Sequence, residues 1–317
     1  MYRIWIDEPF LESAHPLLQG VAELVGPGAP IEELTTCDAA LDPGAGWNAA
    51  RFDLAPRLRV LSRIGVGYDH IDISAATARG IMVCYTPHGP TVSTAEHAVA
   101  LIFAAAKTIT FSDREVRAGR WHAHFSSLKG MELRGRVLGL VGAGRIGCEV
   151  AQIMRAVGMQ VIVCDPVITS ERAAELGLRK IERLEDLLAQ SDVVSLHAPS
   201  TPQTRHMINT ASLNAMKQGA ILVNTARGAL VDECALSAAL QSGHLAAAGL
   251  DVFECEPVST ENPLLQLDNV VLTDHIASHT WAGHQRLYEM AIHHALQALR
   301  GEKPDCLLNE FQRHRKS

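Results

Sequence analysis

The sequence predicts an α/β protein with two domains, each built on a parallel sheet, and three observations favour this fold class. The chain has 317 residues, about twice the length of a typical single domain. From about Val137 to Thr273, short apolar runs alternate with helical stretches, as in a parallel sheet that is covered on both faces. The residues before about position 90 repeat this alternation more weakly.

Six uninterrupted apolar runs predict the strands of the larger sheet. They are Val137–Val141, Gln160–Cys164, Val193–His197, Ile221–Thr225, Ala247–Asp251 and Val270–Thr273. The helices predicted between them are Ile146–Val157, Leu184–Ala189, Leu213–Met216 and Glu233–Gln241. Six strands that alternate with helices at this spacing are what a dinucleotide-binding domain requires.

The remaining segments predict a second domain and the crossings between the two. Its strands are expected at Arg3–Ile6, Val60–Ile64 and Ile81–Cys84, a helix at Ser74–Arg79 before Gly80, and a loop at Asp42–Trp47. A capping box at Ser93–Glu96 predicts the start of a helix through Ala106, which we interpret as the crossover between domains. A last helix is predicted from Trp281 to about Arg300, before a frayed tail at Gln312–Ser317. We therefore expect one domain over residues 1–92 and 284–317, and the other over residues 93–283.

Composition and charge argue against several classes of protein. Lys and Arg total 28 against 35 Asp and Glu, so the net charge is −7, which disfavours nucleic acid or an anionic membrane as the main partner. The longest apolar run, Ala98 to Ala106, is shorter than the roughly 20 residues that cross a bilayer. Asp7 and Glu8 stand where a secretory signal needs an apolar stretch. Seven scattered cysteines fit neither a disulfide framework nor a metal site. We expect a cytoplasmic protein that binds no metal.

A glycine-rich motif, Gly142-Ala143-Gly144-Arg145-Ile146-Gly147, follows the first strand of the larger sheet and opens a helix. In this context Gly142 permits a tight turn, Gly144 lets the backbone approach a pyrophosphate, and Gly147 lets the helix pack closely on the strand. The N-terminus of the helix supplies oriented N–H donors. The alternative, a strand–helix turn that binds no ligand, is disfavoured because every contextual condition of the motif is met.

Asp165 comes directly after the second predicted strand, 18 residues beyond Gly147. A carboxylate there can accept hydrogen bonds from both hydroxyls of the adenosine ribose, and its charge would repel a 2′-phosphate. Pro166 to Thr169, which follow it, offer no cation. The sequence therefore favours NAD over NADP, although an ordinary loop aspartate is the simpler alternative.

Three patches that follow later strands carry polar side chains suited to catalysis. They are Asn224–Gly228, Asp251–Pro257 and Thr273–Ala277. Because the carboxyl ends of parallel strands line one ligand crevice, an arginine, a carboxylate and a histidine are expected to converge there. Arginine can bind a carboxylate and polarise a carbonyl, while histidine exchanges a proton with its oxygen, and a neighbouring carboxylate stabilises the imidazolium. Taken singly, Arg227 could be a surface residue and Glu256 a solvated loop charge.

Over nearly all of its length the chain resembles the D-isomer-specific 2-hydroxyacid dehydrogenase family. The resemblance is carried by the glycine motif, by the three patches, and by the segments Arg63–Asp72, Ser93–His97 and Leu196–Pro199. It leans towards the phosphoglycerate-dehydrogenase-like branch, partly through Arg63 before Ile64-Gly65. The family implies a doubly wound NAD-binding domain that is inserted into a flavodoxin-like substrate domain.

The resemblance also implies roles for single residues. Arg227 would bind the substrate, Glu256 would pair with the histidine, and His275 would be the acid/base, while backbone amides around Val66 and Gly67 would hold the substrate carboxylate. The residues implied to line NAD, besides the glycine motif, are Thr94, Arg145, Ile146, Asp165, His197, Pro199, Thr204, Thr225, Ala226, Arg227, Asp251 and His275. The family further implies a homodimer, formed through the crossover helix and an arm around Trp121.

Two departures from the family pattern put the substrate in doubt. Asp274 precedes the histidine where the family usually has proline, and Leu41–Trp47 replaces a regular strand and polar loop. The leading hypothesis is an oxidoreductase that interconverts a small D-2-hydroxy acid and its 2-oxo acid with NAD. The alternative is an NAD(H)-binding, co-repressor-like regulatory protein on the same fold, which can keep the same trio. A different reaction would need another catalytic set, and the sequence shows none.

Overall fold

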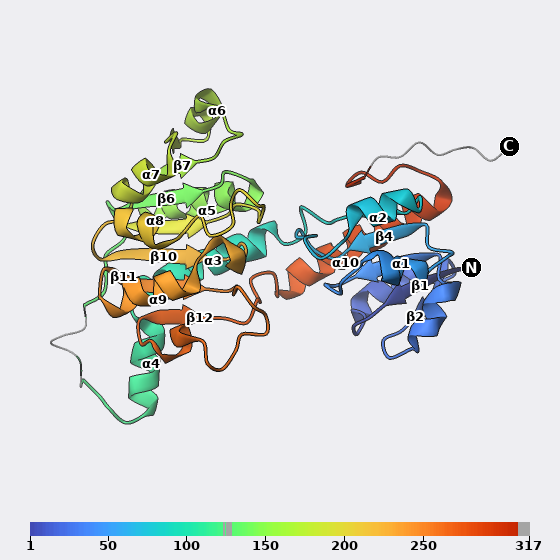
Figure 1. Cartoon of the computed structure of the whole chain (residues 1–317), viewed down its shortest axis with the longest axis horizontal. Coiled ribbons are helices and arrows are strands. Elements are labelled where there is room, and N and C mark those ends of the chain that lie inside the picture. The colour runs from blue at the N-terminus through green and yellow to red at the C-terminus, as the bar shows by residue number, and fades with distance from the viewer. Residues whose placement is uncertain (123, 125–128, 310–317) are drawn as a thin grey trace. The chain divides into compact units, whose positions relative to one another are not determined.

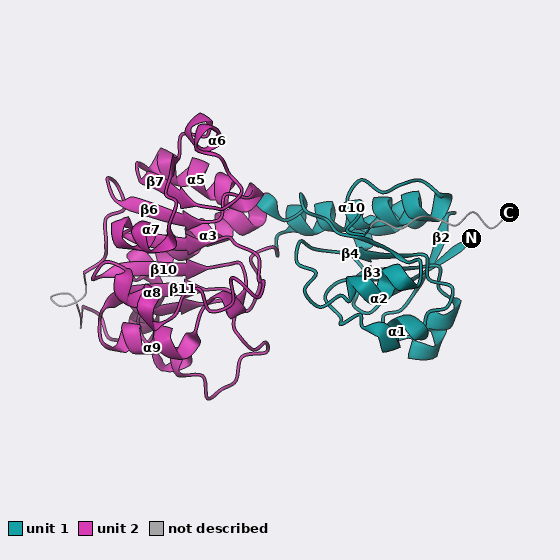
Figure 2. Cartoon of the chain, turned by 45° about the horizontal axis from the view of Figure 1, so that its top comes forward, with its two compact units in different colours: residues 1–91, 279–317 teal, residues 92–278 magenta. Residues whose placement is uncertain are grey.

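The computed structural model describes residues 1–122, 124 and 129–309, so the predicted frayed tail lies outside the described residues. The chain divides into two compact units, which Figure 2 colours separately. Unit 1 comprises Met1–Thr91 and His279–Ser317, and unit 2 comprises Val92–Ser278. The chain thus returns to unit 1 at residue 279 rather than at 284.

Unit 2 is built on a parallel sheet of seven strands. In spatial order they are β12 (Val270–Leu272), β11 (Leu245–Leu250), β10 (Ala220–Asn224), β9 (Val193–Leu196), β6 (Val137–Val141), β7 (Gln160–Cys164) and β8 (Arg179–Lys180). The chain order reverses between β6 and β9, and in such sheets ligands bind outside the strand ends at this switch point. All six predicted strands are present. β8 was not predicted, because it consists of two charged residues that pair with β7.

Helices cover both faces of this sheet (Figure 1). One core joins the sheet to α3 (Thr91–Ala106), α5 (Arg145–Val157) and α6 (Ser170–Glu175), and the other joins it to α7 (Leu184–Gln190), α8 (Thr210–Ala215) and α9 (Glu233–Gln241). A further helix, α4 (Ile109–Arg117), follows α3 and was not predicted. The unit is therefore doubly wound, as expected.

The predicted capping box at the start of α3 is wrong. The helix begins at Thr91, so Ser93 and Glu96 lie inside it. Pro90, whose fixed φ suits the first position of a helix, directly precedes Thr91. Among the described residues, no single helix is long and apolar enough to cross a membrane; only α3 and α4 together, bent by 63°, meet the criteria of length and composition.

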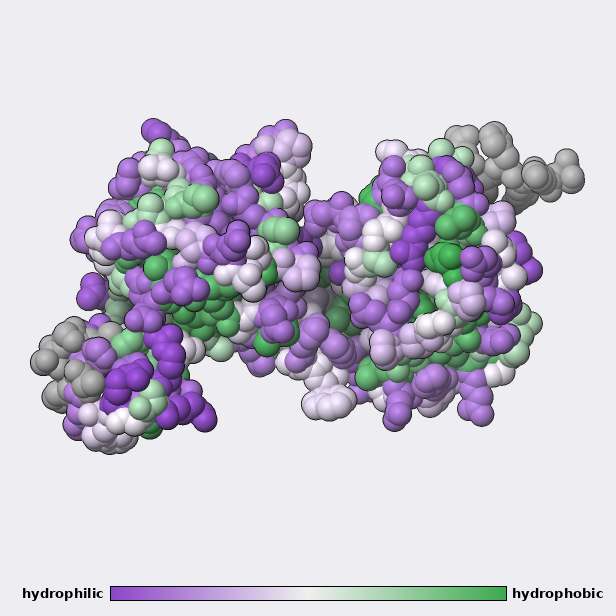
Figure 3. Space-filling view, turned by 60° about the horizontal axis from the view of Figure 1, so that its bottom comes forward, coloured by the Kyte–Doolittle hydropathy of each residue, from purple (hydrophilic) through white to green (hydrophobic). Residues whose placement is uncertain are grey.

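Unit 1 contains a five-stranded parallel sheet in the order β2–β1–β3–β4–β5, which is the flavodoxin-like order. The strands are β1 (Tyr2–Ile6), β2 (Ala22–Val25), β3 (Ala39–Asp42), β4 (Val60–Arg63) and β5 (Met82–Cys84). The long helix α10 (Trp281–Arg300) packs on one face, and α1 (Ala49–Asp53) and α2 (Ile73–Ala78) lie beside the core of the other. Figure 3 shows that both units present mostly hydrophilic side chains on the face in view, with hydrophobic groups scattered among them.

The expectation that Leu41–Trp47 replaces a regular strand is wrong in its first two residues. Leu41 and Asp42 end β3, the central strand of this sheet. Trp47 is fully buried and forms a β-bridge with Ile71. β3 was missed because its four residues, AALD, carry no β-branched or aromatic side chain.

Candidate active site

The glycine motif forms a cradle where β6 meets α5. Gly142 has φ 103°, and a Cβ atom there would lie 2.8 Å from the carbonyl oxygen of His197. A Cβ atom at Gly147 would overlap the carbonyl of Gly142, whereas one at Gly144 would meet open space. The first and third glycines are thus required by packing, and the second borders open space at the N-terminus of a 13-residue helix. This is the arrangement that accommodates a pyrophosphate.

Asp165 links this cradle to the end of β7. Its Oδ2 accepts a hydrogen bond from the N–H of Ala143 at 2.7 Å, and its Oδ1 accepts from Val167 at 2.7 Å and Ile168 at 3.2 Å. Partial burial alone would raise the pKa of this carboxyl, but the three N–H donors and the charge of Lys180 lower it overall. Lys180 lies on the unpredicted β8, and its Nζ is 3.1 Å from Oε2 of Glu182. A cation is therefore closer to Asp165 than the local sequence indicated.

The other residues implied to line NAD belong to unit 2, mostly in loops after β9, β10, β11 and β12, with Thr94 on α3 and Arg145 and Ile146 opening α5. Thr225 is 7% exposed, and within the described part of the chain its Oγ1 has no hydrogen-bond partner. His197 contacts the hydroxyl of Ser195 through Nε2 at 2.9 Å, and burial lowers the pKa of this imidazole to about 4. An unused buried hydroxyl and an open glycine cradle fit a dinucleotide.

The loops after β10, β11 and β12 carry the expected trio. Nδ1 of His275 lies 2.6 Å from Oε2 of Glu256, and Oε1 of Glu256 accepts the N–H of Phe253 at 2.9 Å. Partial burial would raise the pKa of Glu256, but its hydrogen bonds from His275 and Phe253, with the charges of His275 and Arg227, lower it overall. Glu256 is therefore ionised near neutral pH and serves as an acceptor for the imidazole.

Asp251 holds the histidine loop in place. It is fully buried, and its carboxylate accepts hydrogen bonds from the hydroxyl of Thr273 at 2.6 Å and from the N–H groups of Ile276 and Ala277 at 2.9 and 3.0 Å. Its carbonyl accepts the N–H of His275, which has a left-handed φ of 59°. The structure thus gives Asp251, implied by the resemblance to line NAD, a supporting contact with the loop that carries His275.

Sequence reasoning did not anticipate His97 and Thr273 in this arrangement. Nε2 of His97 lies 3.0 Å from the Thr273 hydroxyl and 3.4 Å from Asp251. His97 belongs to a segment that carried the family resemblance, and Thr273 ends a predicted strand. Their pairing joins positions 176 residues apart, which the sequence alone could not show.

The loop that carries Glu256 is fastened to the start of α9. The carboxylates of Glu233 and Glu254 each accept the backbone N–H of the other residue, at 3.0 and 2.6 Å. Gly228 packs so closely on this loop that a Cβ atom would overlap the backbone of Phe253. The positions of Arg227 and Glu256 are thereby linked.

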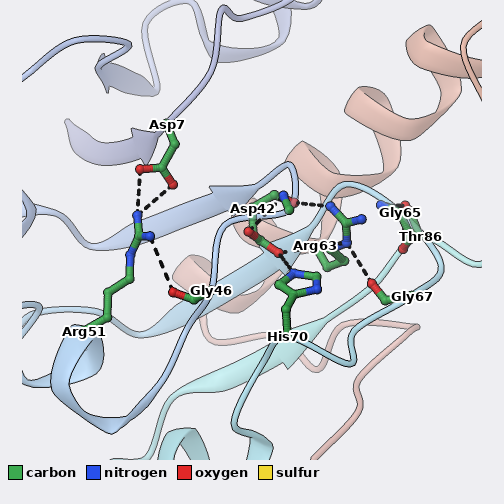
Figure 4. A network of polar contacts seen from close by, with 10 residues as sticks. Asp7, Asp42, Gly46, Arg51, Arg63, Gly65, Gly67, His70 and Thr86 are labelled. Carbon is green, nitrogen blue, oxygen red and sulfur yellow. Dashed lines mark hydrogen bonds and ion pairs between the residues drawn. The ribbon is translucent and has the colours of Figure 1, made fainter. Parts of the chain in front are cut away.

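Val66 and Gly67 belong to unit 1, in the turn after β4. Figure 4 shows this turn beside Asp42, Arg63 and His70. Among the described residues of both units, no three His, Cys, Asp or Glu side chains gather as a metal site would require.

A dinucleotide cradle and a histidine–carboxylate pair at one edge of a doubly wound sheet define the class of protein as an NAD-dependent oxidoreductase. Residues 99–277 match the model of the NAD-binding domain of D-isomer-specific 2-hydroxyacid dehydrogenases. The chain belongs to this family, whose members act on a CH–OH group.

Individual relatives agree with this assignment. The chain is 44% identical over 286 residues to a glyoxylate reductase of Korarchaeum cryptofilum, covering 88% of this chain and 85% of the relative. It is 49% identical over 226 residues to a D-3-phosphoglycerate dehydrogenase of Archaeoglobus fulgidus, covering 71% of this chain but only 42% of the relative. The crystal structure of a D-lactate dehydrogenase of Aquifex aeolicus, complexed with NAD and lactic acid, matches with a TM-score of 0.85 at 30% identity, covering 98% of this chain and 100% of the other.

Proposed function

We propose that this protein interconverts a small 2-oxo acid and the corresponding D-2-hydroxy acid, with His275 as the acid/base. The observation that carries the proposal is the contact of His275 Nδ1 with Glu256 at 2.6 Å. Because Nδ1 is engaged, Nε2 is the ring nitrogen that remains to exchange a proton with a substrate oxygen. The side chain of His275 is 52% exposed, so a substrate can reach it.

The roles of the chain's own residues in reduction follow from this arrangement. The N–H groups of Val66 and Gly67 bind the substrate carboxylate, and Arg227 binds the carboxylate and polarises the neighbouring carbonyl. His275 donates a proton to the C2 oxygen, and Glu256 stabilises the imidazolium before that transfer. The glycine cradle and Asp165 would hold the nicotinamide cofactor, which in its reduced form, NADH, would supply the hydride for C2. Oxidation of the hydroxy acid reverses each role.

A panel of 2-oxo acids tests this function. Glyoxylate, hydroxypyruvate, its 3-phosphate and pyruvate are offered with NADH, and oxidation of NADH is followed by its absorbance. Turnover of at least one acid, abolished in His275→Ala, is the expected result. A protein that binds NADH but turns over none of them would fit the alternative, an NAD(H)-binding regulatory protein.

We also propose a homodimer in the cytoplasm, with no nucleic-acid partner. Ile109, Val116 and Trp121 are 51%, 51% and 71% exposed on α4 and the arm that follows it, and an interface formed through this arm would cover them. All seven cysteines are free, as suits a reducing compartment. Light scattering coupled to gel filtration would test the dimer, and Trp121→Ala with Ile109→Ser is expected to yield monomer.

A further inference from the structure

The turn Gly65–Gly67 is held through the N–H and carbonyl of Gly65 and the carbonyl of Gly67, while the N–H groups of Val66 and Gly67 have no acceptor among the described residues. The N–H of Gly65 donates to the Thr86 hydroxyl at 2.7 Å, and the N–H of Thr86 donates to the Gly65 carbonyl at 3.0 Å. The carbonyl of Gly67 accepts from Nε of Arg63 at 2.8 Å. Within the part of the chain that the structure describes, neither Val66 nor Gly67 donates its backbone N–H to a protein acceptor. These two donors are thus left for a ligand.

Arg63 connects this turn to Asp42 on the neighbouring strand. The two residues are cross-strand partners at the ends of β3 and β4. Nη1 of Arg63 donates to the Asp42 carbonyl at 3.0 Å, and its Nε lies 3.9 Å from the carboxylate. The guanidinium packs directly against Gly65, where a Cβ atom would lie 2.8 Å from Cζ. Arg63 therefore supports the turn at its first residue and bonds to its last.

Asp42 is joined on its other side to His70. Nε2 of His70 lies 2.7 Å from Oδ2 of Asp42, and the N–H of Gly44 donates to Oδ1 at 3.1 Å. The carbonyl of His70 accepts the N–H of Trp47 at 3.0 Å. In Figure 4 the carboxylate of Asp42 lies between the guanidinium and the imidazole. One fully buried carboxylate thus joins the loop after β3 to both sides of the turn after β4.

A fully buried carboxylate is costly to desolvate unless it is paired and hydrogen-bonded, and removal of one partner leaves the others without a counter-charge. The apolar faces of the sheet are already packed, so these charges are not needed to form its core. Arg63 and His70 stand on either side of the turn Gly65–Gly67, and Asp42 contacts both.

We propose that Asp42, Arg63 and His70 are positioning residues that hold the Val66 and Gly67 amides in the geometry that binds the substrate carboxylate. This inference rests on the proposed function, which assigns the substrate carboxylate to those amides. In this proposal Arg63 acts by contacting Gly65, Gly67 and Asp42 of its own chain.

The kinetic test separates positioning from a general loss of structure. Interactions with the carboxylate are made equally in the ground state and the transition state, so their loss raises KM and leaves kcat nearly unchanged. For Asp42→Asn, Arg63→Lys and His70→Phe we expect KM for the best 2-oxo acid to rise about 10- to 100-fold, the size of a lost charge-assisted hydrogen bond. His70→Gln, which keeps an N–H donor, should recover part of the loss. NADH affinity should be unchanged in all four variants.

The matched control is Asp53→Asn. This change also removes a carboxylate from an ion pair of unit 1, since Asp53 accepts two hydrogen bonds from Arg79 at 2.9 and 2.7 Å. It touches no atom of the turn, so KM should stay within about twofold of the wild-type value. An equal rise of KM in Asp53→Asn and Asp42→Asn would overturn the proposal.

Amide hydrogen exchange tests the network without a substrate. Exchange at the hydrogen-bonded amides of Gly44, Trp47 and Gly65 should become at least about 10-fold faster in Asp42→Asn and His70→Phe, but not in Asp53→Asn. Unchanged exchange, or acceleration spread over the whole unit, would overturn the positioning role. If the wild-type protein reduces no 2-oxo acid, the proposed function fails, and the exchange data still decide whether the network holds the turn. Arg63→Lys provides a second folded variant should Asp42→Asn not fold.

Discussion

Nδ1 of His275 and Oε2 of Glu256 lie 2.6 Å apart, and the second oxygen of Glu256 is held by the N–H of Phe253. The carboxylate is therefore fixed by its own loop and cannot turn away from the imidazole without losing a backbone hydrogen bond. This fixes the orientation of the ring and leaves Nε2 open.

Glu256→Gln should shift the pH profile of 2-oxo acid reduction to lower pH. Reduction needs a protonated imidazole, and a neutral amide no longer stabilises that charged form, so the proton is lost at a lower pH. The pH at which kcat/KM begins to decline should therefore fall. Glu261→Gln, which removes an exposed carboxylate of the same unit, serves as control. An unchanged profile in Glu256→Gln would mean that the pair has no role in proton transfer.

His275→Ala should lower kcat for reduction by about 10²- to 10⁴-fold, the usual contribution of a general acid. Its affinity for NADH, measured by fluorescence titration, should stay nearly constant because the glycine cradle and Asp165 are untouched. His88→Ala, at an exposed histidine of unit 1, controls for loss of an imidazole. A His275→Ala enzyme that keeps about a third of wild-type turnover or more would remove His275 from the role.

How much could be predicted from the sequence depended on how local the signal was. β6 and β7 lie at their predicted positions because each is an uninterrupted apolar run that ends at Gly142 or Asp165. β2, β3 and β8 were missed because their sequences, AELV, AALD and RK, are short and contain only one β-branched residue, Val25. They are strands because neighbouring strands supply their hydrogen bonds, which is a tertiary effect.

The same distinction applies to the site. The trio could be located because strand ends in a parallel sheet share an edge. The contacts that support it, such as Glu233 with Glu254 or His97 with Thr273, depend on side-chain directions across long sequence separations. No periodicity or spacing encodes those directions, so only the structure reveals them.

Gly228→Ala should impair catalysis more than cofactor binding. The added methyl group would overlap the backbone of Phe253, so the loop that carries Glu256 must move away from Arg227. Displacements of about 1 Å in catalytic groups can cost about 10²-fold, and we expect a loss of that size in kcat/KM, with a lower Tm. Gly46→Ala, whose Cβ atom would meet open space, is the control. Wild-type kcat/KM in Gly228→Ala would show that the two loops are not coupled.

His197→Asn should make stability less dependent on pH. Burial lowers the pKa of His197 to about 4, against about 6.5 in the unfolded chain. Between these values the unfolded state binds more protons, so acid destabilises the folded state as pH falls from about 6.5 towards 4. At pH 5 this destabilisation of the folded state amounts to about 2 kcal/mol. His197→Asn has no imidazole at this position and should not show it.

The measurement is urea unfolding at pH 7 and at pH 5. The free energy of unfolding of the wild-type protein should fall further between the two than that of His197→Asn, while His88→Asn should behave as the wild type. If the free energy of unfolding depended on pH equally in the wild type and in His197→Asn, folding would not lower the pKa of His197.

The structure adds one feature to the basis of cofactor choice. Asp165 should accept hydrogen bonds from the ribose hydroxyls of NAD and repel the 2′-phosphate of NADP, giving a preference for NAD of at least about 10²-fold in kcat/KM. The charge of Lys180 acts on Asp165, so a cation that could attract a phosphate is already present on β8. Lys180 also pairs with Glu182 at 3.1 Å, so while Asp165 is ionised its repulsion of a 2′-phosphate outweighs the attraction by Lys180.

Asp165→Ser should therefore narrow the preference mainly by improving use of NADP, and Lys180→Met in that background should reverse much of the gain. The serine also loses the acceptor for the Ala143 N–H, so kcat/KM with NAD should fall as well. Lys180→Met alone should leave NADP poorly used, because the repulsion by Asp165 remains. The comparison needs kcat/KM for both cofactors in all four enzymes. Equal kcat/KM for NAD and NADP in the wild-type enzyme would show that Asp165 does not face the ribose. If the increase of kcat/KM with NADP in Asp165→Ser were unaffected by Lys180→Met, the lysine would be excluded as its source.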